Sequence, residues 1–151
     1  MDSTRNVFVA DRENQRIQKL DKNGSFLTTW GSVGGGNGQF DGPQGLGVDG
    51  SGNVFVADVG GDRIQKFNNS GMFLTTWGSL GSKSGQFAGP SGVTVDGSGN
   101  VFVADTFNNR MQKFDNNGTF LTAWGGNGQF KTGGLPAGVA VGRKIRASPP
   151  G

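Results

Sequence analysis

The sequence predicts an all-β protein built from one unit that occurs three times. The stretch Asn-Val-Phe-Val-Ala-Asp is found at Asn6–Asp11, Asn53–Asp58 and Asn100–Asp105, so the period is 47 residues. An arginine and a tryptophan recur at the same spacing, as Arg16, Arg63 and Arg110 and as Trp30, Trp77 and Trp124. Inside each unit apolar and polar residues alternate with a period of two, which is typical of strands. A repeat of about 40 to 50 residues indicates propeller blades or helical arrays, and the period of two favours a β-propeller.

Each unit is expected to form four short strands, a to d, and no segment has a helical period. In the second unit strands b, c and d are predicted at Val54–Ala57, Arg63–Phe67 and Phe73–Trp77, and Gly92–Val95 is the strand a that follows. The segments Asp49–Asn53 and Asp21–Gly24 are rich in residues that accept a positive φ, so they predict the a–b and c–d turns. A long glycine-rich link, Gly31–Gln44, connects strand d to the next strand a.

The number of strands predicts how the propeller closes. The units supply three, four and four strands, followed by a last strand a at Gly138–Val141. Propellers close with about 4 to 8 blades, and an open arc leaves two strand edges that invite pairing. We therefore expect a homodimer, in which two chains of three blades form a six-bladed ring and each lends Gly138–Val141 to the other's first blade. The alternative is a piece of a longer propeller.

The predicted blades occupy residues 1–142, and residues 143–151 form a basic irregular tail. The third unit differs from the others in the spacing that follows Trp124, and Gly142 stands where the first two units have aspartate after strand a. The register of the last strand is therefore left open.

Four motifs together resemble the NHL repeat. They read Gly-Pro-Ser-Gly-Val-Thr-Val-Asp, Gly-Asn-Val-Phe-Val-Ala-Asp, Asn-Arg-Met-Gln-Lys-Phe and Gly-Thr-Phe-Leu-Thr-Ala-Trp-Gly. The resemblance extends over residues 6 to 142 and implies a β-propeller of four-stranded blades, often six. Members of the family bind RNA or proteins or act as extracellular sensors, and some related propellers are lyases.

An acid and a base flank every b–c loop, five residues apart, and we interpret them as a structural clamp repeated in each blade. The pairs are Asp11 with Arg16, Asp58 with Arg63, and Asp105 with Arg110. The ends of a hairpin meet, so either an ion pair or a bond from the carboxylate to the backbone is expected. An ion-binding site in each blade is the alternative, but repetition in all three units favours a structural role.

The repeated aromatic residues are interpreted as packing between blades, although they could stack bases or sugars. They are Trp30, Trp77, Trp124, Phe40, Phe87 and Phe130. Asp49 and Asp96 are expected to cap turns, because the pattern lacks the later ligands of a calcium loop. The run Gly34–Gly38 resembles a phosphate loop only in its glycine content, since no Gly-Lys-Ser/Thr follows it.

The b–c loops differ in sequence while their flanks are nearly identical. Loops on a rigid scaffold are common binding sites, so we predict that any ligand lies on this face, with neutral drift as the alternative. The candidate binding residues are Arg12, Asn14, Asp62, Phe107 and Asn109. Phe107 is the one apolar candidate, and its exposure would need an explanation.

Composition excludes several functions. The chain has no Cys, His or Tyr, which excludes a Ser-His-Asp triad, a cysteine nucleophile and a Cys- or His-based metal site. We expect no catalysis, no cofactor and no metal. No leader or membrane-spanning run is visible, so we expect a soluble chain without membrane contact, in a compartment the sequence does not define.

The remaining candidates are a binding or interaction scaffold for a protein or peptide, an RNA-binding module, and a recently duplicated repeat without a ligand. The net charge of +3 raises the question of nucleic acid. Residues 1–130 hold all 11 acidic residues and 10 basic ones, however, and four basic residues lie beyond them. The excess positive charge therefore belongs to the end of the chain, which makes nucleic acid the second choice after the scaffold.

Overall fold

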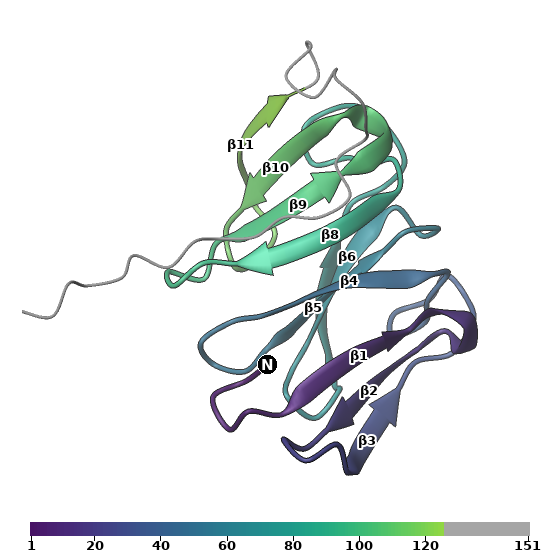
Figure 1. Cartoon of the computed structure of the whole chain (residues 1–151). Coiled ribbons are helices and arrows are strands. Elements are labelled where there is room, and N and C mark those ends of the chain that lie inside the picture. Colours follow the sequence, from purple (N-terminus) through teal and green to yellow (C-terminus); the bar gives the residue numbers. More distant parts are fainter. Residues whose placement is uncertain (126–151) are drawn as a thin grey trace, which may run out of the picture.

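The computed structural model describes residues 1–125, which form three antiparallel sheets that follow one another along the chain (Figure 1). The first sheet contains β1 (Val7–Asp11), β2 (Arg16–Leu20) and β3 (Phe26–Trp30). The second contains β4 (Pro43–Val48), β5 (Val54–Asp58), β6 (Arg63–Phe67) and β7 (Phe73–Trp77). The third contains β8 (Pro90–Val95), β9 (Val101–Asp105), β10 (Arg110–Phe114) and β11 (Phe120–Gly125). The predicted all-β class is confirmed, and we call the sheets blades 1, 2 and 3.

Two details differ from the predictions. Strand a begins at Pro90 rather than Gly92, and at Pro43 in the preceding blade, which shortens the glycine-rich link. The b–c loops, where no helix was expected, contain two 3-10 helices at Arg12–Asn14 and Thr106–Asn108. A single turn of this kind has no sequence period to reveal it. The predicted strand Gly138–Val141, Gly142, Phe130 and the segment 143–151 lie outside the described residues.

The strand register separates the connections onto two faces. Strand b ends beside the start of strand c at Asp58 and Arg63, and strand a starts opposite the same Asp58 at Pro43. Strand d ends beside Ile64, at Trp77, near the same loop. The b–c loops and the d–a linkers therefore share one face, which we call the loop face. The a–b and c–d turns lie on the opposite face, called the turn face.

Apolar residues fill the two junctions between blades. Each blade has two apolar sides. The side with the phenylalanine of strand b, the isoleucine or methionine of strand c and the tryptophan of strand d is called the trailing side. At each junction it packs on the leading side of the next blade, which carries the two valines of strand b and the phenylalanine of strand c. Phe8, Ile17 and Trp30 of blade 1 meet Val54, Val56 and Phe67 of blade 2. Phe55, Ile64 and Trp77 of blade 2 meet Val101, Val103 and Phe114 of blade 3 in the same way. Phe40 and Phe87 are buried in these junctions, so four members of the repeated aromatic set, Phe40, Phe87, Trp30 and Trp77, pack between blades as expected. Trp124 differs, because it is 40% exposed and contacts Phe102 of its own blade.

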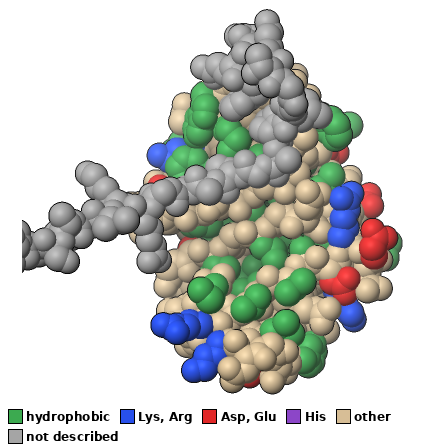
Figure 2. Space-filling model, in the orientation of Figure 1, with side chains coloured by type: hydrophobic (Ala, Val, Ile, Leu, Met, Phe, Trp, Pro, Cys, Tyr) green, Lys and Arg blue, Asp and Glu red, His purple; other side chains and the backbone are tan. Residues whose placement is uncertain are grey.

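The leading side of blade 1 has no neighbour among the described residues. Val7 and Val9 are 40% and 39% exposed, whereas Val54 and Val56 at the equivalent positions of blade 2 are fully buried. Hydrophobic side chains accordingly gather on the surface over β1 in the lower part of Figure 2. Blade 1 also lacks a strand a, because β1 pairs only with β2 within residues 1–125.

The innermost strands approach each other through their backbones. A Cβ added to Gly45 in β4 would lie 2.8 Å from the carbonyl oxygen of Ser91 and 2.9 Å from the Cα of Gly92 in β8. Glycine at this position lets the blades meet closely at the centre. No helix within residues 1–125 is long and apolar enough to cross a membrane.

Candidate functional site on the loop face

An ion pair closes every b–c loop. The Nε of Arg16, Arg63 and Arg110 lies 2.7, 3.3 and 2.7 Å from the carboxylates of Asp11, Asp58 and Asp105. The backbone N–H groups of Asp41 and Ala88 also donate to the carboxylates of Asp58 and Asp105, each at 2.8 Å. In blades 2 and 3 the two expected alternatives, an ion pair and a backbone bond, therefore occur together.

The clamp arginines of blades 2 and 3 also hold the linker that precedes them. Arg63 donates to the carbonyl oxygens of Gly35, Gly36 and Gln39 at 2.7 to 3.0 Å. Arg110 donates at 2.8 Å to three carbonyls at the equivalent positions, those of Ser82, Lys83 and Gln86. The clamp therefore fixes the d–a linker as well as its own loop.

Buried glutamines complete this attachment. Gln65 donates to the carbonyl of Gln39 at 2.6 Å and accepts the N–H of Gly38 at 2.8 Å. Gln112 makes the same pair of bonds to Gln86 and Gly85. Sequence reasoning missed these side chains, although an Arg-x-Gln pattern at the 47-residue spacing could have revealed them.

The same aspartate has different pKa shifts in blades 1 and 2. Hydrogen bonds from Arg16 and Asn14, followed by the charge of Arg16, lower the pKa of Asp11. Burial raises the pKa of Asp58 against the opposing bonds from Asp41 and Arg63, and the nearby Asp41 carboxylate adds to that rise. The pKa of the clamp aspartate is therefore raised in blade 2, where the aspartate is buried, and lowered in blade 1, where it is partly exposed.

The three b–c loops share a backbone conformation in spite of their different sequences. Each ends in a left-handed residue, with φ of 53° at Gln15, 50° at Asp62 and 51° at Asn109. The side chains of Gln15 and Asp62 accept the N–H of Gly42 and Gly89 at 2.6 and 2.8 Å. The last residue of each b–c loop therefore has the same left-handed backbone conformation, although the residue type differs.

Three candidate binding residues contact the scaffold. Asn14 donates to both carboxylate oxygens of Asp11, at 3.1 and 3.0 Å. Asp62 is held by Gly89, as above, and Arg12 donates to Gln44 at 3.0 Å while lying over Gly42. Arg12 and Asp62 thus bond residues that lead into or belong to the following blade, but none of the hydrogen bonds described above joins one b–c loop directly to another.

Phe107 is an exposed candidate, with 65% of its surface open to solvent. Its ring lies over Gly89, where an added Cβ would be 2.5 Å from a ring carbon. Its backbone N–H donates to Ala88 at 3.0 Å, and the neighbouring Asn108 donates to Gly81 at 2.8 Å. The loop is therefore anchored to both ends of the linker 81–89, and the aromatic ring stands on a fixed base.

The turn-face aspartates form turns, as the sequence predicted. Asp49 accepts the N–H groups of Ser51 and Asn53, and Asp96 accepts those of Ser98 and Asn100, all at 2.9 to 3.0 Å. No group of three acidic, His or Cys side chains that could hold a metal occurs in the part of the chain that the structure describes.

Antiparallel sheets that pack side to side in sequence order are the blades of a β-propeller. Residues 40–67 and 87–114 match the NHL repeat, each spanning the start of a strand a and the end of a strand c. These two segments are therefore NHL repeats, in keeping with the β-propeller arrangement of the three sheets. No curated protein sequence matches it.

Solved structures share the fold at low sequence identity. A streptogramin B lyase structure is 22% identical with a TM-score of 0.64, and the match covers 82% of this chain and 38% of that one. A catalytically inactive histidine-to-alanine variant of virginiamycin B lyase from Staphylococcus aureus, with quinupristin, is 18% identical with a TM-score of 0.63, covering 82% and 39%. A nidogen/laminin complex is 18% identical with a TM-score of 0.63, covering 88% and 45%. The present chain thus spans about two fifths of the length of these structures.

Proposed function

We propose that this chain is a non-catalytic binding scaffold, that two copies assemble into a six-bladed ring, and that a protein or peptide ligand binds the loop face. The main observation in support of the ring concerns a glycine of the c–d turn, which in blades 2 and 3 lies under a tryptophan of the preceding blade. We call this glycine position the tryptophan seat. Trp30 lies against Gly71, and Trp77 against Gly118, where an added Cβ would be 2.5 Å from the indole ring. At Gly24, the equivalent position of blade 1, no atom of residues 1–125 is found within 4 Å of the added Cβ.

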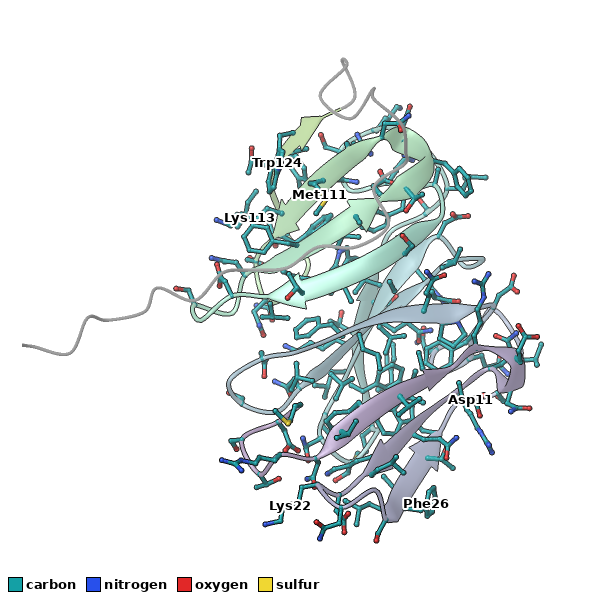
Figure 3. All side chains as sticks on the ribbon, viewed as in Figure 1. Asp11, Lys22, Phe26, Met111, Lys113 and Trp124 are labelled. Carbon is teal, nitrogen blue, oxygen red and sulfur yellow. The ribbon has the colours of Figure 1, made fainter. Side chains whose placement is uncertain are left out.

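The opposite end of the arc carries the matching tryptophan. Trp30 and Trp77 each contact a phenylalanine of the next blade, with ring centroids 5.7 Å from Phe67 and 5.6 Å from Phe114. Trp124 is 40% exposed and contacts Phe102 of its own blade. Figure 3 shows Trp124 and Met111 at the end of the molecule opposite Phe26 and Asp11. Three blades of a six-bladed ring span half a turn, so a second copy related by a two-fold axis brings the leading side of each blade 1 to the trailing side of the other copy's blade 3.

The first clamp supports the same arrangement. Arg16 bonds Asp11 and, within residues 1–125, no linker carbonyl, whereas Arg63 and Arg110 each hold three. The side chain of Arg16 is 41% exposed. In the proposed ring the third unit of a second chain supplies this linker, and its strand at Gly138–Val141 pairs with the open edge of β1.

The absence of histidine supports a non-catalytic role. The virginiamycin B lyase variant described above is catalytically inactive and has alanine in place of one histidine. This chain has no histidine and no tyrosine. The ion pairs of the described residues are the three clamps, in which each carboxylate is bonded by the arginine of its own loop.

The mass in solution tests the ring. In sedimentation equilibrium we expect about twice the chain mass of 15.7 kDa. Gly24→Val fills the tryptophan seat and should give monomers. Gly38→Val is the matched control, because Gly38 has a similar positive φ of 80° and open space on the loop face. A single-chain mass for the unmodified protein contradicts the ring.

A peptide selection tests the loop face. A random peptide library selected against the immobilised protein should yield binders that are lost on Phe107→Ala. They should be retained on Leu74→Ala, an exposed apolar residue of the outer strand β7. Binders that depend on Leu74 contradict this assignment. Binding of single-stranded RNA that weakens steeply with salt would instead favour the nucleic-acid alternative.

A further inference from the structure

An asparagine connects neighbouring blades on the turn face at both internal junctions. The side-chain N–H of Asn69 in blade 2 donates to Asp2 of blade 1 at 3.1 Å, and that of Asn116 in blade 3 donates to Asp49 of blade 2 at 3.3 Å. The amide oxygens of the same residues accept Nζ of Lys19 and Lys66, at 2.5 and 2.7 Å. Each junction thus has one lysine, one aspartate and one neutral amide between them.

Blade 3 carries the first two members of this set on its trailing side, which packs on no other blade within residues 1–125. Lys113 follows Lys19 and Lys66 at the 47-residue spacing, and its Nζ lies 5.4 Å from the ring centroid of Phe102. Asp96 follows Asp2 and Asp49 in the same way. Burial by itself would raise the pKa of Asp96, but hydrogen bonds from Asn100 and Ser98 and the charge of Lys113 lower it, so this carboxylate is ionised at neutral pH.

The third member differs in blade 1, because Lys22 occupies the place of Asn69 and Asn116. Lys22 is exposed, and Figure 3 shows it at the end of the molecule opposite Lys113. An ammonium group donates hydrogen bonds as the amide N–H does, but it carries a charge and accepts none. The carboxylate of Asp96 is the group that can bind it.

We propose that Lys22 of one copy binds Asp96 of a second copy, so that an ion pair holds the junctions that close the ring, where the internal junctions have a neutral asparagine. This inference rests on the proposed ring. Lys113 retains an acceptor, because Lys19 and Lys66 also donate to the backbone carbonyls of Asn69 and Asn116, each at 3.2 Å. Asp96 then lies between two ammonium groups and attracts both.

An ionic closing junction makes assembly depend on salt. Exposed ion pairs are screened as ionic strength rises, while the apolar contacts beside them are not. The pair also orients the assembly, because two leading sides would bring Lys22 against Lys22, and two trailing sides would bring Lys113 against Lys113. Like charges of this kind disfavour the wrong pairings.

Dimer dissociation constants at low and high salt test the proposal. Between about 0.05 and 0.5 M NaCl we expect the constant to rise about two- to fivefold for the unmodified chain. Lys22→Asn, which restores the residue of the other two turns, should remove this salt dependence and leave a dimer. Asp96→Asn should weaken the dimer at low salt, and in the double variant the two changes should not be additive.

Asp49→Asn is the matched control, because Asp49 has the same role at an internal junction. It should reduce stability and leave the salt dependence of the dimer unchanged. If the dimer dissociation constant changes neither with salt nor on Lys22→Asn, the ion pair is wrong and the proposed ring is still supported. A dimer that tightens with salt also overturns the ion pair, since repulsion between Lys22 and Lys113 then dominates. Monomers in every condition overturn the ring itself.

Discussion

Blades 1 and 2 contain the same pentapeptide, Val-Phe-Val-Ala-Asp, in two different environments. In β5 all five residues are buried, whereas in β1 the two valines are exposed and the other three are half-buried. The aspartate that ends each strand forms the same ion pair, but the side chain of Asp58 is inaccessible and that of Asp11 is 21% exposed. The difference arises from what covers each strand. A blade of this protein obtains its core from its neighbours as much as from its own strands.

The largest effect is expected at the tryptophan seats, where Gly71 of blade 2 can be compared with Gly24 of blade 1. Gly71→Ala places a methyl group 2.5 Å from the ring of Trp30, at a φ of +88°, and should destabilise the fold by about 2 to 4 kcal/mol. Gly24→Ala has a similar φ and open space in a single chain, so it should cost about 1 kcal/mol at protein concentrations too low for assembly, and more where the proposed ring forms. Urea denaturation measures both. Equal losses would show that Gly24 is covered too, as the ring requires.

The exposed and buried valines provide the next test. Val56→Ala removes two buried methyl groups and should cost about 2 kcal/mol. Val9→Ala removes the same groups from a partly exposed position and should cost less than about 1 kcal/mol in a single chain. Denaturation midpoints at several protein concentrations separate the cases, because assembly would increase the cost of Val9→Ala as the concentration rises.

The two clamp aspartates should respond to pH in opposite directions. The folded pKa of Asp11 is lowered, so its contribution is present above the ordinary value of 3.8 and is lost as pH falls through the lowered pKa. The folded pKa of Asp58 is raised, so stability decreases as pH rises from 3.8 through the raised pKa. Asp41→Ala, which copies Ala88 of the next unit, should lower the pKa of Asp58 and add less than about 1 kcal/mol at neutral pH. Urea unfolding of this variant and of Asp11→Asn from about pH 3 to pH 7 tests both signs.

The smallest effect is expected at Phe107. Because most of its ring is exposed, Phe107→Ala should change stability by less than about 1 kcal/mol. A thermal unfolding scan measures the change. A large loss would mean that the contact of Phe107 with Gly89 belongs to the core. The phenyl group of Phe107 would then not form part of a ligand surface.

Most of the fold could be predicted from the sequence because the repeat shows which residues are equivalent. A period of two placed the strands, and the acid and base five residues apart identified the clamp. The bounds of strand a were less accurate, because β4 and β8 begin at Pro43 and Pro90, and a proline is accepted at the first position of a strand as readily as in the turn before it.

The candidate site was harder to predict. Asn14 and Asp62 stand in variable loops and were assigned to ligand binding, yet their side chains bond the scaffold. Spacing along the chain does not show whether an exposed polar residue faces solvent or a neighbouring linker. The seats at Gly71 and Gly118 were missed for a related reason, because a turn glycine and a glycine that receives an aromatic ring have the same sequence signature.

The attachment of each linker by the following blade has a consequence for cooperativity. Linker 31–42 leaves blade 1 but is bonded by Arg63 and Gln65 of blade 2, and linker 78–89 is bonded in the same way by Arg110 and Gln112 of blade 3. Loss of one blade therefore releases the segment that leads into it as well as exposing the apolar side of its neighbour. Unfolding should pass from blade to blade through coupled nearest neighbours, so the closing junctions of the proposed ring would determine whether the protein melts from its ends or as one unit.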